Sequence, residues 1–412
     1  MANALLAPKI YANTMLALLV NQLVGAKLVT TQFKNEFKEV GNTIYVKRPP
    51  LFNLRTGAVA DVQDVVEGEV AVTLDQQAGV DVAFTSLEDT NTVTALLRST
   101  VLRSAASTIA QGIDSAIAAK TLEFPSWVGT PGNAVERDAK FLKAPERLDN
   151  FAVPSTDRNG ILAPSDWWGT AATFTGLYAQ RDVADEALKR AALPVLGDVQ
   201  PYKTQNVVNL TVGTRAASGA SQVDGANQNV TYSSVRTNYQ QTLNIKGLTS
   251  GHTVKKGEVF SIASVNAVNP KSGADLGFVQ QFVVLADATA DGAGKIALTI
   301  ANPIIVAGTG ADRAYATVTA APADSANITW LGTASTAYRQ NAVFHKSAIA
   351  LTYAKLTQPY SGESAYSTDP DTGVTVRYWR ASDIVNDKHF HRWDVLYGVT
   401  NVDRRLGTRL SG

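Results

Sequence analysis

The sequence of 412 residues contains no cysteine, only four histidines and two methionines. The absence of cysteine excludes disulfides, thiolate metal sites and cysteine nucleophiles. Basic and acidic residues nearly cancel, 37 against 36, so no overall field draws the chain to nucleic acid or to an anionic membrane. The longest apolar run near the start, Met15 to Val20, is too short to cross a bilayer, and no cleavage site frames it. We therefore expect a chain that is made and used in a cytoplasm and does not contact a membrane.

Apolar residues, in contrast, make up 45% of the chain, enough for a large core in two or three domains. The strongest pattern lies in residues 93–121, where apolar side chains recur every fourth residue and predict one amphipathic helix. Gly112 and Ala116 widen its apolar stripe, and Asp114 belongs to the polar side. At 1.5 Å per residue this helix spans roughly 43 Å, which is long enough to act as a beam of a large domain.

Two further patterns precede this helix. Residues 1–40 have the apolar spacing of a helical N-terminal arm. Residues 41–90 begin with a short strand and continue with two alternating runs that predict a hairpin, with its tip at 76–79 or, in a longer hairpin, nearer Gly57 or Gly68. Because a lone hairpin is marginal in water, it must lie on the rest of the chain or on a neighbouring subunit.

The composition changes twice after the long helix. Residues 123–209 mix helical and strand patterns, with a strand after Arg158 and a helical stretch from Phe174 to Leu193. Residues 210–335 contain short strands separated by turn residues, which predicts a small β-barrel or sandwich. Because the mixed character returns in 336–412, we interpret the β block as an insertion into a host α+β domain.

Motifs that carry chemistry are missing. His389 and His391 share a face of a predicted strand, but no close carboxylate pair completes a metal site around them. The chain has no G-x-S-x-G elbow, Walker loop or dinucleotide fingerprint. We therefore predict no enzymatic activity, no cofactor and no bound metal. The basic turn at Lys255-Lys256 and the three arginines of 404–409 are interpreted as inter-subunit or solvent charges.

Five stretches follow one another in a recognisable order: Gly41–Pro49 (GNTIYVKRP), Ile109–Asp114 (IAQGID), Val254–Ile262 (VKKGEVFSI) with Val268–Pro270, Phe344–Ala348 (FHKSA) and Arg392–Gly398 (RWDVLYG). With them the chain resembles the major capsid (coat) proteins of tailed bacteriophages, of the Salmonella podovirus type that carries an inserted domain. The resemblance implies an α+β capsid shell fold with these parts: an N-arm (1–40), a strand and extended loop (41–90), the spine helix of a peripheral domain (91–122), the first part of the peripheral and axial domains (123–209), an inserted β-barrel (210–335) and the return of both domains with the C-terminus (336–412).

The resemblance also implies a function. It implies a structural virion protein that forms the hexamers and pentamers of an icosahedral shell around double-stranded DNA, and that is assembled in the host cytoplasm. The expected partners are further copies of the chain, a scaffolding protein, a portal protein and packaged DNA that is contacted without sequence specificity. Since the arm pattern starts within the first ten residues, we expect a separate scaffolding protein, an uncleaved coat and maturation by expansion. No Lys and Asn arrangement for crosslinking is visible in the extended loop.

Candidate contacts between subunits lie in the extended loop and in a loop of the insert. They comprise apolar side chains that we expect a neighbour to cover and charged residues of both loops: Val70, Val72, Leu74, Arg55, Asp61, Lys271 and Asp275. The alternative from another class is a phage tail or surface binding module whose β block binds carbohydrate. A hydrolase is a third option, which lacks a nucleophile constellation.

Overall fold

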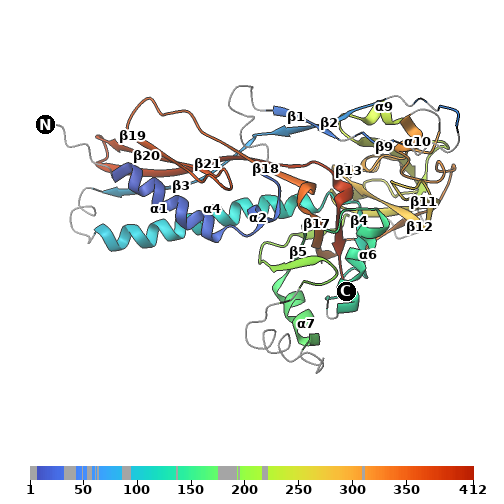
Figure 1. Cartoon of the computed structure of the whole chain (residues 1–412), viewed down its shortest axis with the longest axis horizontal. Coiled ribbons are helices and arrows are strands. Elements are labelled where there is room, and N and C mark those ends of the chain that lie inside the picture. Colours follow the sequence, from blue (N-terminus) through green and yellow to red (C-terminus); the bar gives the residue numbers. More distant parts are fainter. Residues whose placement is uncertain are drawn as a thin grey trace. The chain divides into compact units, whose positions relative to one another are not determined.

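The computed structural model describes residues 7–31, 43–48, 50–52, 58–60, 62, 65–85, 94–135, 138–174, 193, 195–215, 221–308 and 311–412. The chain forms two compact units, each assembled from separate segments, with a mixture of helices and strands (Figure 1). Unit 1 comprises residues 1–44, 72–118 and 349–400, and unit 2 comprises residues 45–71, 119–348 and 401–412. None of the described helices is both long enough and apolar enough to span a membrane.

Unit 1 is built on a sheet with the order β18, β21, β20, β19, in which β3 also pairs with β21. Its strands are β3 (Gln76–Thr85), β18 (Ile349–Ala354), β19 (Glu363–Thr368), β20 (Thr375–Asp383) and β21 (Lys388–Asn401). Helix α1 (Ala7–Gln22) packs on β19 and β20 and buries Ala12, Met15 and Leu19 completely. The short helix α2 (Gly25–Leu28) follows it. The first part of the predicted arm therefore contacts a sheet of its own chain.

Helix α4 (Thr94–Thr121) confirms the predicted long helix, and its residues up to Ala118 belong to unit 1. The predicted stripe is buried from Ala105 onward, at Ala105, Ile109, Ile113 and Ile117. Of the two residues predicted to widen this stripe, Gly112 is exposed and Ala116 is half-buried. Most of the widening comes from the other flank, from Leu102, Ala106, Ala110 and Ala118. Asp114, which the pattern placed on the polar side, is also buried.

The predicted hairpin of residues 70–74 and 80–84 is wrong. Strand β2 (Gly68–Thr73) pairs with β1 (Thr43–Arg48), whereas β3 pairs antiparallel with β21 over ten residue pairs, from Gln76 opposite Tyr397 to Thr85 opposite Lys388. Alternation shows which face of a strand is buried but does not specify the partner strand, and β21 pairs with β3 over its whole length. The alternative of a longer hairpin agrees better, because residues 49–67 connect β1 to β2. We restrict the name extended loop, which the resemblance implied for a longer stretch within 41–90, to residues 49–67.

Unit 2 contains a mixed five-stranded sheet with the order β4, β22, β17, β5, β6. These strands are β4 (Ser126–Val128), β5 (Arg158–Leu162), β6 (Val199–Lys203), β17 (Asn341–His345) and β22 (Gly407–Leu410). The helical elements of this region are α5 (Asp138–Phe141), α6 (Lys143–Asn150), α7 (Pro164–Phe174), η2 (Lys346–Ala348) and η3 (Arg404–Leu406). The predicted strand after Arg158 is confirmed. The predicted helix between Phe174 and Leu193 lies outside the described residues except for its two ends.

The insert, residues 210–335, is an all-β body within unit 2. Its six-stranded sheet has the order β15, β11, β12, β14, β9, β8, and a bridge between Gln222 and Asn327 joins the two ends of that order into a barrel. At the base, β7 (Asn209–Thr211), which enters the insert, pairs with β16 (Ala337–Arg339), which leaves it. The strands are β8 (Gln222–Val223), β9 (Gln240–Lys246), β10 (Thr253–Val254), β11 (Val259–Val268), β12 (Asp275–Val284), β13 (Ala288–Thr289), β14 (Ile296–Ala301) and β15 (Ile328–Trp330), with the short helices α9 (Tyr232–Val235) and α10 (Ala311–Ala314).

Candidate functional site

The apolar side chains expected to contact a neighbour are covered within the chain itself. Val70, Val72 and Leu74 are only 7%, 0% and 9% exposed. The structure thus corrects the expectation that these three side chains are left uncovered, because a neighbouring subunit would find almost none of their surface. The two charged candidates of the same segment, Arg55 and Asp61, lie outside the described residues.

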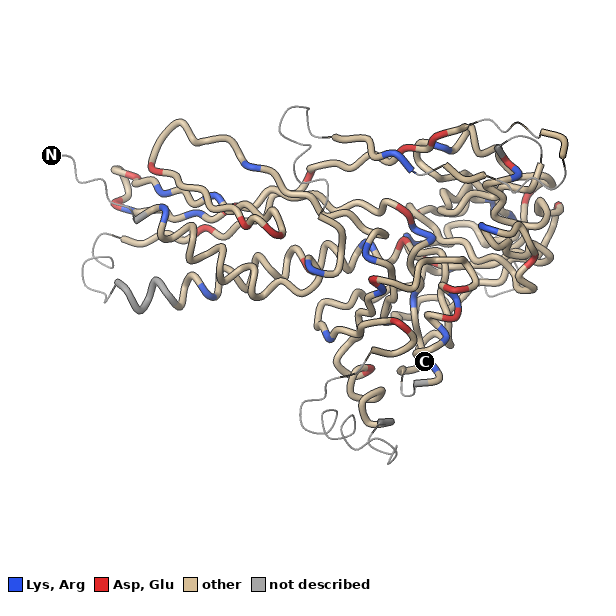
Figure 2. The backbone as a smooth tube through the Cα atoms, viewed as in Figure 1, with Lys and Arg blue, Asp and Glu red and all other residues tan. Residues whose placement is uncertain are grey.

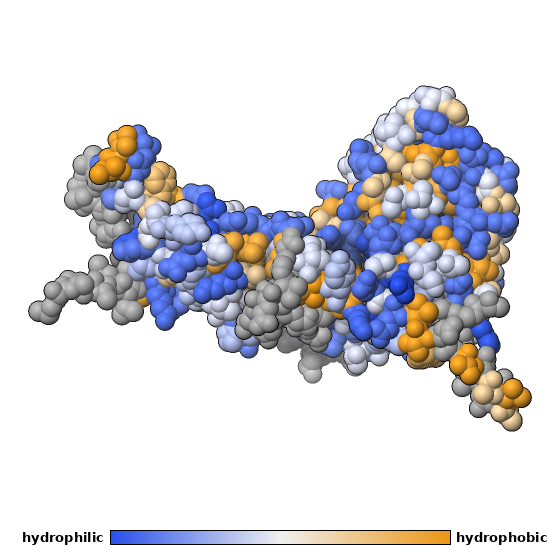
Figure 3. Space-filling model, turned by 90° about the horizontal axis from the view of Figure 1, so that it is seen from above, coloured by the Kyte–Doolittle hydropathy of each residue, from blue (hydrophilic) through white to orange (hydrophobic). Residues whose placement is uncertain are grey.

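Apolar surface is exposed on the extended loop instead. Val59, Val62 and Val65 are 84%, 90% and 61% exposed, and Phe52 is 58% exposed. Figure 3 shows that hydrophobic residues, in orange, reach the surface at several places on the face that it displays. These four residues follow neither a strand period nor a helix period, so no pattern in the sequence distinguishes them. They are candidate contact residues, beside other exposed apolar residues elsewhere in the described chain such as Tyr360, Ile384 and Val385.

The base of the extended loop lies on the insert. The hydroxyl group of Tyr315 accepts a hydrogen bond from the backbone N–H of Leu51 (2.9 Å) and donates one to the carbonyl of Val66 (3.3 Å). The Tyr315 ring stacks on Tyr232, with 3.5 Å between the ring centroids and 4° between the planes. Burial raises the pKa of the Tyr232 hydroxyl. Figure 1 shows β1 and β2 running beside α9 and α10, the short helices next to these tyrosines.

The two candidates in the insert, Lys271 and Asp275, lie at the tip of the hairpin formed by β11 and β12. Both are exposed. The Asp275 carboxylate accepts hydrogen bonds from Asn266 Nδ2 (3.0 Å) and from the backbone N–H of Gly277 (2.8 Å), which together lower its pKa. The backbone N–H of Lys271 binds Asn269 Oδ1 (2.9 Å). These contacts shape the turn and leave the ammonium group of Lys271 at the surface.

The basic turn of the insert and the basic C-terminal end meet around one buried carboxylate. Glu123, 5% exposed, accepts hydrogen bonds from Lys256 Nζ (2.9 Å), Arg404 Nε (3.1 Å) and Asn401 Nδ2 (2.9 Å). Burial alone would raise its pKa, but Arg404, Lys120 and Lys256 outweigh burial and hold it at about 2. Two of the charges that were interpreted as inter-subunit or solvent charges are therefore bound within the chain.

Arg409 corrects the same interpretation more strongly, because its side chain is completely buried. Its Nη1 atom donates to the carbonyl of Gly257 (2.7 Å) and to Gln340 Oε1 (3.2 Å), and its guanidinium lies over the Trp127 ring. Burial lowers the pKa of Arg409 to about 9. Arg409 therefore links β22 to the insert inside the chain and offers no surface to another subunit.

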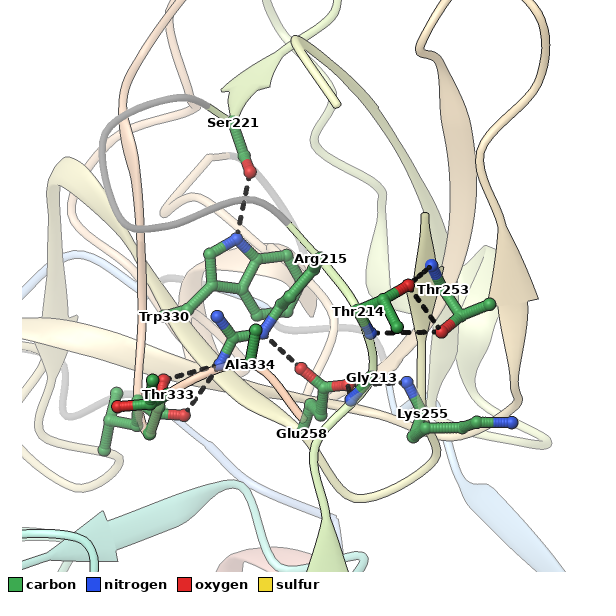
Figure 4. Close-up of polar contacts among 12 residues, drawn as sticks. Gly213, Thr214, Arg215, Ser221, Thr253, Lys255, Glu258, Trp330, Thr333 and Ala334 are labelled. Atoms are coloured by element: carbon green, nitrogen blue, oxygen red, sulfur yellow. Dashed lines mark hydrogen bonds and ion pairs between the residues drawn. The ribbon is translucent and has the colours of Figure 1, made fainter. Parts of the chain in front are cut away.

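A second buried ion pair joins the beginning and the end of the insert (Figure 4). The Glu258 carboxylate pairs with Arg215 and also accepts the backbone N–H groups of Gly213 (2.8 Å) and Lys255 (2.7 Å). Arg215 Nη2 donates to the carbonyl groups of Leu331 and Gly332, at 3.0 and 2.9 Å. Both charged side chains are at most 1% exposed, and burial lowers the pKa of Arg215. The pair therefore holds the segment that enters the insert, at Arg215, next to the segment that leaves it, at Leu331 and Gly332.

The two histidines singled out in the sequence make hydrogen bonds within their sheet. His389 Nδ1 lies 2.8 Å from Ser382 Oγ, and His391 Nδ1 lies 2.7 Å from the Tyr378 hydroxyl. Within the described ranges, no group of three or more His, Asp or Glu side chains is placed to hold a metal ion.

Comparison with known proteins identifies the family. Residues 18–412 match the family model described as P22 coat protein, gene protein 5. The chain belongs to the P22 coat protein family. It is accordingly a bacteriophage coat protein, as the resemblance in the sequence implied. Because the match spans almost the whole coat protein, the alternative of a tail or surface binding module is set aside.

Several solved structures from phages are similar to this coat protein. A structure from Mycobacterium phage Che8 is 11% identical with a TM-score of 0.46, and the match covers 94% of the coat protein and 90% of that chain. The capsid of cyanophage P-SCSP1u is 10% identical with a TM-score of 0.44, covering 93% and 86%. The CUS-3 coat protein I-domain is 31% identical with a TM-score of 0.22, covering 29% of the coat protein and all of that chain. No curated protein matched.

Proposed function

We propose that this coat protein forms the hexamers and pentamers of an icosahedral shell around double-stranded DNA, and that the extended loop makes the contact between neighbouring subunits. The observation that supports this most directly is the exposed apolar set on that loop, Phe52, Val59, Val62 and Val65. In this proposal a separate scaffolding protein and a portal protein take part in assembly in the host cytoplasm, and the shell expands on maturation. The protein acts by binding its own copies and catalyses no reaction.

The energetics of such a contact are adequate for a shell. Complete burial of one exposed valine or phenylalanine side chain contributes roughly 1.5–3 kcal/mol. Ordering the loop and its partner offsets part of this gain, so each contact is weak by itself. When a heterologous contact is repeated in a closed arrangement, each subunit is held by several contacts at once. The particle is then stable although the affinity of each single interface is low.

The charge distribution agrees with a shell that holds DNA without reading its sequence. Figure 2 shows Lys and Arg interspersed with Asp and Glu along the described backbone of both units. With 37 basic and 36 acidic residues, a general attraction of the whole protein to phosphate is small. We therefore propose that contacts with the packaged DNA are few per subunit, so that the salt dependence of binding is shallow for each subunit.

The test is assembly of full-length protein with one loop residue changed. We expect Val62→Asp to prevent closed particles when the coat protein is mixed with its scaffolding protein, because the carboxylate must lose its water at the interface. Since Val62 is 90% exposed, the variant should unfold at the same urea concentration as the wild type. Val195→Asp, which changes another exposed valine (59%) of unit 2, is the matched control. Light scattering and negative-stain images give the readout, and normal particles from Val62→Asp would contradict the proposal.

A further inference from the structure

We propose that the insert positions the extended loop for assembly, through three tyrosines that we call the tyrosine anchor: Tyr232, Tyr239 and Tyr315. This inference rests on the proposed function of the loop as the inter-subunit contact. It gives the insert a role inside its own subunit, in addition to any contact that its surface makes.

The central element of the anchor is the Tyr315 hydroxyl group. It binds the loop at both of its ends, because it accepts from Leu51 N–H at 2.9 Å and donates to the carbonyl of Val66 at 3.3 Å. Leu51 and Val66 also pack against the apolar cluster that contains the anchor. One side chain of the insert thus closes a loop of 16 residues, counted from Leu51 to Val66. Closing the loop at its base removes much of its conformational freedom.

The Tyr315 ring is itself held in place. Its stack on Tyr232 has nearly parallel planes, and the backbone N–H of Tyr232 donates to the Asp312 carboxylate at 2.6 Å. At the hydroxyl end of Tyr232, strand β2 passes so closely that only glycine fits: a Cβ atom on Gly68 would lie 2.5 Å from the Tyr232 hydroxyl oxygen. The anchor therefore defines the distance between β2 and the insert.

Two further contacts hold the strands that carry the loop. The guanidinium of Arg48, at the end of β1, lies 4.9 Å from the centroid of the Tyr239 ring. The backbone N–H of Glu69, in β2, donates to the carbonyl of Arg236 at 3.2 Å. Together with the Tyr315 bridge these contacts tie each strand separately to the insert. Both strands are thus fixed at the point where they enter the loop.

This arrangement has a consequence for assembly. The exposed residues Val59 and Val62 lie between the two anchored ends of the loop, so the anchor limits how far they can move from the insert. A loop whose two ends are held before binding loses less conformational entropy on association than a loop with free ends does. Loosening the anchor should therefore weaken assembly although it leaves the contacting side chains unchanged.

The first experiment measures loop order in the full-length monomer. Tyr315→Phe keeps the ring and removes the hydroxyl, and we expect about fivefold faster hydrogen exchange at the Leu51 amide, which corresponds to the loss of one hydrogen bond. The matched control is Tyr338→Phe, which also removes a hydroxyl that accepts one backbone N–H, that of Thr333 at 2.8 Å. This control should leave exchange at Leu51 unchanged. Unchanged exchange in Tyr315→Phe, or an equal increase in both variants, would overturn the inference.

The second experiment measures assembly with scaffolding protein for the same two variants. We expect Tyr315→Phe to need about fivefold more protein for half-maximal assembly than Tyr338→Phe does, at equal stability toward urea. Equal assembly of the two variants would overturn the positioning role. Failure of the proposed function has a different signature: Val62→Asp would then assemble normally, whatever the exchange rate at Leu51 in Tyr315→Phe.

Discussion

Replacement of the buried carboxylate of Glu123 tests the electrostatics that join the insert to its host. In the change Glu123→Gln the side chain keeps its shape and its capacity to accept a hydrogen bond from Asn401, but it loses the charge that faces Lys256 and Arg404. The variant therefore isolates the charge from the packing. We expect it to fold and to be clearly less stable than the wild type at neutral pH.

The magnitude follows from the pKa of Glu123, which falls from an ordinary 4.5 to about 2 in the folded chain. This difference corresponds to roughly 3 kcal/mol of stability at neutral pH, since one pKa unit is about 1.4 kcal/mol. Because the folded pKa lies below the unfolded one, the stabilisation is complete well above pH 4.5 and is lost as the pH falls from 4.5 to about 2. Breaking a buried ion pair typically costs about 3–5 kcal/mol, which agrees with this value.

The assay is urea unfolding of the full-length wild type and variant at a series of pH values. We expect the difference in the free energy of unfolding to be roughly 3 kcal/mol near neutrality and roughly 2 kcal/mol at about pH 3.5. Glu363→Gln is the matched control: Glu363 also pairs with an arginine, Arg380 at 2.7 Å, but its side chain is 58% exposed, so the expected loss is below about 1 kcal/mol. A difference for Glu123→Gln that is no larger than this control, or that does not shrink at acid pH, would refute the reasoning.

Three further predictions concern single side chains, each measured by urea unfolding. Arg215→Leu leaves the buried Glu258 carboxylate without its cation, and we expect a loss of about 3–5 kcal/mol. Gly68→Ala forces a methyl group against the Tyr232 hydroxyl, and we expect a loss of about 1–3 kcal/mol that Tyr232→Phe partly restores in a double-mutant cycle. Asp114→Ala removes the acceptor of two backbone N–H groups and should cost about 1–3 kcal/mol. Burial raises the pKa of Asp114 above 3.8, so the contribution of this one group to stability rises as the pH falls toward 3.8, and the difference in stability between wild type and variant widens.

The sequence predicts those parts of the fold in which the signal is local. Helix α4 and strand β5 are predicted correctly because an apolar period reports the buried face of the element itself. The partner of β3 is not a local property, since the same alternation serves any strand that packs on the same face. Residues of β21 that lie some 300 positions further along the chain decide the pairing, and periodicity carries no information about them.

The candidate contact residues show the same difference between what a local sequence pattern indicates and what only the tertiary structure shows. An alternating run such as the one around Val72 is the sign of a strand with one buried face, so its apolar residues are covered by the fold and are unavailable to a partner. Exposed apolar residues such as Val62 follow no period, and only the tertiary structure distinguishes them from the core. The tyrosines of the anchor could not be found from sequence either, because Tyr315 and Leu51 are separated by 264 positions.

The contacts of unit 2 also determine what removal of the insert would do to the rest of the chain. The side-chain amide of Gln281 forms hydrogen bonds with both the N–H and the carbonyl of Trp127, at 2.8 and 3.0 Å, and so completes the backbone pairing of β4. Lys256 balances part of the charge of buried Glu123, and Gly257 accepts from buried Arg409. Without the insert, the backbone of Trp127, the Glu123 carboxylate and the Arg409 guanidinium would each lose a hydrogen-bond partner. Each polar or charged group left without its partner costs about 1–3 kcal/mol or more. A host domain that evolved with these contacts therefore depends on the insert for its own stability, even though the barrel has a separate core.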